Sequence, residues 1–341
     1  MALLEVSHLQ VKLQTDRGPA LAVRDVSFSL DRSDTLGLVG ESGCGKSMTA
    51  MAIMGLLPEQ AELAGSIRLD GQELISQGED EMSRIRGNRI GMIFQEPMTA
   101  LNPVHTIGDQ VAEPLRLHRG VSAAHARKQA IALLDRVGIA DAARRIDAYP
   151  HQFSGGQRQR VTIAMALACG PDLLIADEPT TALDVTVQKQ ILELLAGLVA
   201  ERGMALMLIS HDLGVVAQNV ARTLVMYGGS VVESGPTESV FAHRMHPYTL
   251  GLFAARPALR SKKTERLATI PGTVPELADL PSGCPFAGRC CFTIAECHVT
   301  VPPPYELEPG HQARCIRLEA VAAAKSASAP AVHHPGREQA Q

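Results

Sequence analysis

Alternating and continuous runs of apolar residues predict the strands of this chain. Residues 3–31 alternate apolar and polar positions on both sides of a turn at residues 15–19, which predicts a pair of antiparallel strands. Short uninterrupted apolar runs follow at residues 36–39, 173–176 and 205–209, and such runs are typical of strands buried on both faces. The pattern therefore predicts a mixed sheet with antiparallel strands at its front.

Apolar residues at helical spacing predict where the helices lie. Residues 123–137 show this spacing in a stretch rich in Ala, Leu, Arg and Gln, and residues 185–201 have the pattern of an amphipathic helix. The first of these belongs to a helical subdomain that we expect at about residues 100–160. The alternation of strands and helices on either side of this insertion is typical of an α/β fold.

A change of composition after residue 255 divides the chain. Residues 1–255 supply the strands and helices of one α/β domain, whereas residues 256–318 are rich in Pro and charge and predict a linker followed by a cysteine-bearing extension. Residues 319–341 are rich in Ala and Ser and predict a disordered tail.

Charge, apolar runs and cysteine content limit the class of protein. The formal net charge of −4 gives no basic surface for nucleic acid. The apolar runs are far too short to cross a bilayer, and we expect no export signal at the start of the chain, so work at a membrane would require partner subunits. Seven cysteines in such a chain indicate a reducing compartment, where clustered thiols are metal ligands or free thiols rather than disulfides.

A glycine-rich segment follows the first predicted buried strand. Residues 40–47 read Gly-Glu-Ser-Gly-Cys-Gly-Lys-Ser, which lets consecutive backbone N–H groups curl around phosphate oxygens. Lys46 adds a positive charge toward the β- and γ-phosphates, and Ser47 offers a hydroxyl to Mg²⁺ at a helix N-terminus. The predicted nucleotide-binding residues are Gly40, Glu41, Ser42, Gly43, Cys44, Gly45, Lys46 and Ser47. Because the helix N-terminus and Lys46 favour a thiolate, we also expect maleimide to label Cys44 and MgATP to protect it.

Two adjacent carboxylates end the second buried strand. Asp177 follows four apolar residues, so it should lie at the carboxyl edge of the sheet beside Ser47 and hold Mg²⁺ there, directly or through water. Glu178 can point in a different direction and accept a proton from the water that attacks the γ-phosphate. Together with the glycine-rich loop, these carboxylates predict NTP hydrolysis.

The chain resembles the ATP-binding-cassette (ABC) ATPases, because several motifs occur in the order of that family. Residues 153–160 read Phe-Ser-Gly-Gly-Gln-Arg-Gln-Arg, and residues 173–184 read Leu-Leu-Ile-Ala-Asp-Glu-Pro-Thr-Thr-Ala-Leu-Asp. The resemblance implies a P-loop NTPase fold of the ABC type that binds ATP and Mg²⁺. The catalytic residues that it implies are Glu178, His211 and Gln95, the last of which would also contact Mg²⁺.

The same resemblance implies an assembly. In the family, a signature loop closes on nucleotide held by a second ATPase subunit, which is a copy of the chain or a different chain. This loop matches Ser154, Gly155 and Gly156, and Asp184 falls in the dimer-contact loop. Two transmembrane permease subunits and an extracytoplasmic solute-binding protein would complete a transporter, with this chain at the cytoplasmic face of the membrane.

The C-terminal part is similar to the ATPases of bacterial dipeptide and oligopeptide importers, which sometimes carry nickel. Residues 246–250 read His-Pro-Tyr-Thr-Leu, and residues 284–290 read Cys-Pro-Phe-Ala-Gly-Arg-Cys. The cysteines with the spacing C-x5-C-x6-C-x17-C are Cys284, Cys290, Cys297 and Cys315. Four thiolates suit an Fe–S cluster or a structural Zn²⁺, family members with this pattern are associated with a [4Fe–4S] cluster, and unliganded thiols are the third alternative. The adjacent Cys291 leaves the register of the pattern open.

One departure from the family concerns adenine. The family usually stacks the base on an aromatic residue where Leu13 aligns, yet the first aromatic residue of this chain is Phe28. Without stacking, ATP would bind about 5- to 150-fold more weakly than in relatives unless other contacts compensate. Two rival classes are ABC ATPases of DNA repair and ribosome-associated ABC ATPases; the chain shows neither the coiled coils or basic face of the first nor the paired cassettes of the second.

Overall fold

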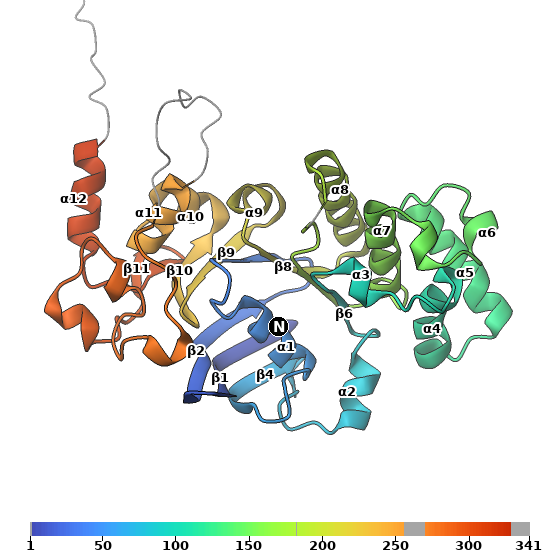
Figure 1. Ribbon diagram of the computed structural model, residues 1–341, viewed down its shortest axis with the longest axis horizontal. Helices are drawn as coiled ribbons and strands as arrows, with labels where there is room; N and C mark the ends of the chain where they lie inside the picture. The colour runs from blue at the N-terminus through green and yellow to red at the C-terminus, as the bar shows by residue number, and fades with distance from the viewer. Residues whose placement is uncertain (1, 182, 256–269, 329–341) are drawn as a thin grey trace, which may run out of the picture.

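The structure is a computed structural model that describes residues 2–181, 183–255 and 270–328 of the 341-residue chain. Within these residues the strands form two sheets, one of four strands and one of eight. The smaller sheet (blue in Figure 1) lies below the larger one, and a lobe of green helices lies at one end of the molecule. Residues 256–269, where the predicted linker begins, and residues 329–341, the end of the predicted tail, lie outside the described residues.

The front sheet is antiparallel, as the alternating pattern predicts. Its strands, in the spatial order β2-β1-β4-β5, are β1 (Leu4–Thr15), β2 (Gly18–Leu30), β4 (Glu62–Leu69) and β5 (Gln72–Glu73). The turn between β4 and β5 places Asp70 and Gly71 at φ values of 48° and 79°, the left-handed pair that a tight hairpin requires. Every second residue of β1 is buried over much of its length, so the sheet presents one apolar face to the core.

The main sheet has a parallel centre and an antiparallel edge. Its strands, in the order β11-β12-β10-β9-β3-β8-β7-β6, are β3 (Thr35–Val39), β6 (Ile90–Ile93), β7 (Leu173–Asp177), β8 (Ala205–Ser210), β9 (Arg222–Tyr227), β10 (Ser230–Pro236), β11 (Tyr305–Glu308) and β12 (His311–Ala313). The strands β6, β7, β8, β3 and β9 pair in parallel, so their carboxyl ends lie along one edge. All residues of β7 and β8 are buried, which explains their continuous apolar runs.

The helices divide between the flanks of the sheets and the inserted lobe. The flanking helices are α1 (Lys46–Met54), α2 (Glu79–Ile85), α8 (Val185–Arg202) and α9 (Leu213–Asn219). The lobe consists of α3 (Pro97–Ala100), α4 (Ile107–Arg119), α5 (Ala123–Arg136), α6 (Ala142–Arg145), η1 (Pro150–Gln152) and α7 (Gly155–Ala166) (Figure 1). Buried apolar residues from α4, α5 and α7 share one core, as the helical spacing predicts. In the described part of the chain, no helix has the length and apolar character to cross a membrane.

The C-terminal part of the chain joins the main sheet. Its elements are α10 (Thr237–His243), α11 (Pro247–Ala254), η2 (Leu277–Asp279), η3 (Ala287–Arg289), η4 (Ala295–His298), β11 and β12. Strand β12 pairs with β10, and the side chains of His311 and Glu233, both fully buried, lie 2.9 Å apart (Nε2 to Oε1). A buried charge needs such a partner, so this contact fixes the extension to the cassette. The division at residue 255 stays a prediction.

The prediction of a disordered tail is wrong for its first residues. Residues Leu318–Ser328 form α12, the red helix at the edge of Figure 1, instead of a disordered segment. The stretch is rich in Ala, the residue with the highest helix propensity, and Val321 is fully buried. The low complexity of the stretch therefore did not indicate a helix, which the buried Val321 and a hydrogen bond from Lys325 Nζ to the carbonyl oxygen of His243 hold against the fold.

Candidate nucleotide-binding and catalytic site

The glycine-rich loop connects the end of β3 to the start of α1. Gly45 has a φ of +100°, and a Cβ there would lie 2.7 Å from the carbonyl oxygen of Ala22, so only glycine fits. Lys46 is buried, and its Nζ donates to the carbonyl oxygens of Gly40 and Glu41 at 2.9 Å each. The lysine thus holds its ammonium group inside the loop.

A cavity lies over this loop. The loop residues that line it are Ser42, Gly43, Gly45, Lys46 and Ser47. Gln95 and Glu178 line the same cavity, so the structure brings residues together that lie far apart in the sequence. The predicted binding residues Gly40, Glu41 and Cys44 are not among the lining residues.

Asp177 lies at the end of β7, close to the start of α1. Its side chain is 4% exposed, its Oδ1 has no hydrogen-bond partner, and its carboxylate interacts with the Ser47 hydroxyl. Burial raises the pKa of Asp177, although Ser47 and Lys46 act in the opposite direction. A buried carboxylate oxygen without a partner beside a hydroxyl is a donor set that suits Mg²⁺. These residues therefore fit the ion that the sequence predicts.

The side chains of His211 and Gln95 both contact one oxygen of Glu178. His211 Nδ1 lies 3.1 Å from Glu178 Oε2, and Gln95 Nε2 lies 3.2 Å from the same atom. They meet because Gln95 follows β6, Glu178 follows β7 and His211 follows β8, and these three parallel neighbours end at one edge of the sheet. Glu178 has a φ of +46°, which is uncommon for a residue other than glycine and typical of functional sites.

Thr181 is a further contact of Glu178 that the sequence reasoning missed. Its hydroxyl donates to Glu178 Oε2 at 2.9 Å. A hydroxyl three residues after a carboxylate in a turn is the signal that could have shown it. Thr181 therefore adds a third donor to the oxygen that faces His211 and Gln95.

The signature residues lie apart from this cavity. Ser154 caps α7: its Oγ accepts from the Gln157 N–H, and the Gln157 side chain accepts in return from the Ser154 N–H at 3.2 Å. Asp184 caps α8 by accepting from the Val187 N–H at 3.0 Å. Ser154, Gly155 and Asp184 are exposed, so the structure leaves two helix N-termini open to another molecule.

An arginine of the extension contacts the glycine-rich loop on the side that faces away from the cavity. Arg289 forms a two-point ion pair with Glu41, with Nη1–Oε2 and Nη2–Oε1 distances of 2.7 and 3.2 Å, and its side chain is only 6% exposed. The Glu41 N–H donates to the buried Tyr248 hydroxyl at 2.7 Å, and the rings of Tyr227 and Phe286 pack beside it. Glu41 therefore positions the loop rather than facing the cavity.

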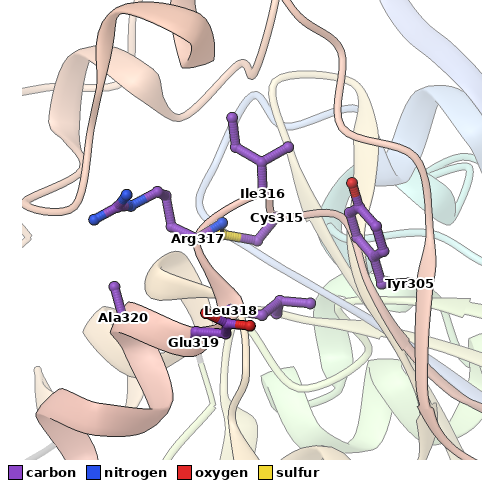
Figure 2. A pocket seen from close by; sticks show the side chains of 7 residues that line it. All are labelled: Tyr305, Cys315, Ile316, Arg317, Leu318, Glu319 and Ala320. Carbon is purple, nitrogen blue, oxygen red and sulfur yellow. Dashed lines mark hydrogen bonds between the residues drawn. The ribbon is translucent and has the colours of Figure 1, made fainter.

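The four patterned cysteines line one small cavity of the extension. Cys284, Cys290, Cys297 and Cys315 line it, and the exposed Cys291 does not. Burial raises the pKa of Cys284 to about 12. Cys315 also borders a shallower hollow beside Tyr305 and the start of α12, which Figure 2 shows. In the described ranges, no three His, Cys, Asp or Glu side chains form a group that could hold a metal ion.

The expected reactivity of Cys44 is not supported by its surroundings. Its side chain is 1% exposed, and burial raises the pKa of the thiol despite the nearby Lys46. The sequence indicates the charged neighbour Lys46 but not the packing around the thiol. Cys44 Sγ is packed so closely against Gly40 that a Cβ on Gly40 would lie 2.7 Å from it.

We now expect maleimide to label Cys291 and to spare Cys44 in the folded protein. Mass spectrometry of peptides after brief labelling would measure both sites. The Cys291→Ser variant should lose the fast reaction, and the wild-type protein in denaturant should show Cys44 labelled. Rapid modification of Cys44 in folded protein would contradict this placement.

Comparisons with known proteins agree with the fold and show the family. The profile of the ABC transporter family matches residues 23–181, and that of the oligopeptide/dipeptide transporter C-terminal region matches residues 232–297. A Brucella melitensis protein named as a candidate peptide import ATP-binding protein is 52% identical over 333 residues, 94% of this chain and 98% of its own length. The oligopeptide transport ATP-binding protein OppD of Mycobacterium tuberculosis is 50% identical over 320 residues, 94% of this chain and 52% of that protein.

A solved structure is similar as well. The ATP-binding cassette MJ0796, in a dimeric post-hydrolysis state bound to ADP and Pi, has a TM-score of 0.62 and 29% identity over 69% of this chain and 98% of its own. The glycine-rich loop, the paired carboxylates and the mixed sheet define an ATP-hydrolysing cassette. The chain belongs to the ABC transporter ATP-binding proteins that carry the oligopeptide/dipeptide transporter C-terminal region. The two rival classes of ABC ATPase are not favoured.

Proposed function

We propose that this chain powers the import of dipeptides or oligopeptides as the ATPase subunit at the cytoplasmic face of a membrane. The observation that carries the proposal is the joint presence of the Glu178 cluster and a peptide-transporter extension built into the same sheet. The relatives named for peptide import and oligopeptide transport support the substrate class.

The residues of the cavity divide the chemistry between them. Backbone N–H groups of residues 42–47 and the Lys46 ammonium bind the phosphates. Ser47, Asp177 and Gln95 would hold Mg²⁺, which neutralises charge on the phosphates when bound. Glu178 takes the proton of the attacking water, and His211 with Gln95 fixes the orientation of its carboxylate.

Assembly follows from the exposed helix N-termini. Ser154, Gly155 and Gly156 donate to the γ-phosphate held by a second ATPase subunit, and Asp184 contacts that subunit. The partner is a copy of this chain or a related chain. ATP then joins the two subunits, and hydrolysis releases them, which moves two transmembrane permeases that receive peptide from an extracytoplasmic binding protein.

Reconstitution tests the proposed function. The chain would be purified together with two transmembrane permeases and an extracytoplasmic peptide-binding protein and placed in lipid vesicles. We expect peptide-loaded binding protein to stimulate ATP hydrolysis and peptide uptake, and the Lys46→Ala complex to do neither. Stimulation by nickel or by nucleic acid, and not by peptides, would overturn the peptide assignment.

The cysteine cavity supports a separate prediction, that it holds a [4Fe–4S] cluster, with Zn²⁺ as the alternative. The support is that four thiols border one buried space. Unliganded thiols stay the third alternative, because the described residues contain no group of three such side chains that could hold a metal ion. The [4Fe–4S] prediction is the one that iron analysis tests directly.

Protein purified without oxygen should therefore be brown and contain about four irons per chain. Replacing Cys284, Cys290, Cys297 or Cys315 by Ser should remove the colour, measured by visible absorption and iron analysis. The Cys291→Ser variant, which changes a thiol outside the cavity, should keep it. Colourless protein with one zinc per chain would favour zinc, and metal-free protein with an ordered extension would favour unliganded thiols.

A further inference from the structure

The cavity over the glycine-rich loop has an apolar wall that comes from two distant parts of the chain. Leu13 on β1 and Leu277 on η2 both line it, and both are half-buried. Ala22 on β2 also lines the cavity, and its carbonyl oxygen lies against Gly45, so the front sheet meets the loop here. The described lining contains no aromatic residue. The surface available to the base of a nucleotide is therefore aliphatic.

A network of charges holds η2 at this position. Arg17, in the turn between β1 and β2, donates to both oxygens of Asp279 at 2.7 Å each and to Glu276 Oε2 at 3.2 Å. Exposed ion pairs are individually weak, but a two-point contact of arginine with a carboxylate fixes geometry. Because Asp279 and Glu276 flank Leu277, the contact keeps this leucine over the cavity.

The two leucines supply apolar surface for the base, which the residues that contact the phosphates do not provide. The loop and Glu178 are polar and face the triphosphate, whereas a purine base needs apolar surface against its ring faces. Leu13 alone offers a small apolar surface, which would leave part of a base exposed. Leu277 adds apolar surface from a separate element of the same cavity.

We propose that Leu277 of the C-terminal extension binds the purine base of ATP together with Leu13, so that the extension completes the nucleotide site of its own chain. The inference rests on the proposed ATPase function and adds to it. Arg17 acts as a positioning residue, since it touches η2 and not the base.

Calorimetry with two ligands tests the inference, because ATP has a base and inorganic tripolyphosphate has none. In the full-length protein, Leu277→Ala should weaken ATP binding about tenfold and leave tripolyphosphate binding unchanged. Leu13→Ala should have the same base-dependent effect. The matched control is Val299→Ala, an exposed apolar residue of the extension outside the cavity, which should change neither affinity.

A charge exchange tests the positioning role. Arg17→Asp should weaken ATP binding and not tripolyphosphate binding, and adding Asp279→Arg in the same chain should restore it. Restoration shows that the ion pair acts on the base site, since a general loss of stability would not be base-dependent.

Two results would overturn the inference. Equal weakening of ATP and tripolyphosphate by Leu277→Ala would show that the extension acts on the phosphate loop instead. No change with either ligand would show that Leu277 only packs on β2. Wild-type protein that binds neither ligand would contradict the proposed ATPase function itself.

Discussion

Glu178→Gln is expected to lower ATP turnover by about 10²-fold or more while ATP binding stays intact. The amide is the same size and can still face Gln95 and His211, but it cannot accept the proton of the attacking water. Turnover would be measured as phosphate release at saturating ATP, and binding by calorimetry. Size-exclusion chromatography with MgATP should also show an ATP-bound dimer, because hydrolysis no longer separates the subunits.

The matched control for this prediction is Glu193→Gln. Glu193 is an exposed glutamate on α8, paired only loosely with Lys189 at 3.7 Å, so the same chemical change there should leave turnover near the wild-type value. Near-normal hydrolysis by Glu178→Gln would exclude this carboxylate as the general base.

Lys46→Ala is expected to weaken ATP binding about 10- to 150-fold. The buried ammonium lies inside the loop, 2.9 Å from two carbonyl oxygens, and the substitution removes the charge that faces the β- and γ-phosphates. Calorimetry with ATP would measure the loss, and Lys189→Ala, an exposed lysine on α8, should show none.

The thermal unfolding midpoint without nucleotide separates binding from folding in this experiment. Lys46→Ala should lower that midpoint more than Lys189→Ala, because it removes two buried hydrogen bonds. The rise on adding ATP is the measure of binding, and it should be much smaller for Lys46→Ala than for Lys189→Ala. Unchanged ATP affinity in Lys46→Ala would mean that the loop does not bind the triphosphate.

The part of the site that lies at strand ends could be predicted from the sequence. Asp177 and Glu178 follow a short apolar run, which predicts their place at the carboxyl edge of the sheet. Gln95 and His211 are implied only by the resemblance to the ABC ATPases, and the parallel strands bring them to the same edge. The front hairpins and the helical insertion could be predicted for a similar reason, since each depends on a local period.

Contacts between distant segments could not be predicted in this way. Nothing near Arg289 in the sequence indicates that its guanidinium would meet Glu41, and the neighbours of Cys44 along the chain do not show the packing that buries it. Leu277 lies in a stretch that reads as a loop, and only its place beside the front sheet brings it to the nucleotide cavity. Such contacts depend on tertiary packing, which periodicity does not encode.

The ion pair between Glu41 and Arg289 joins residues 248 positions apart, and this separation sets an order of events during translation. The ribosome delivers the glycine-rich loop early and the arginine that braces it late, after all the parallel strands have emerged. In the nascent chain, Glu41 therefore lacks its ion pair with Arg289 until residue 289 leaves the ribosomal exit tunnel. A chain that ends before residue 289 would therefore contain every predicted catalytic side chain, but Glu41 would keep only its contact with Tyr248 and lack its ion pair with Arg289.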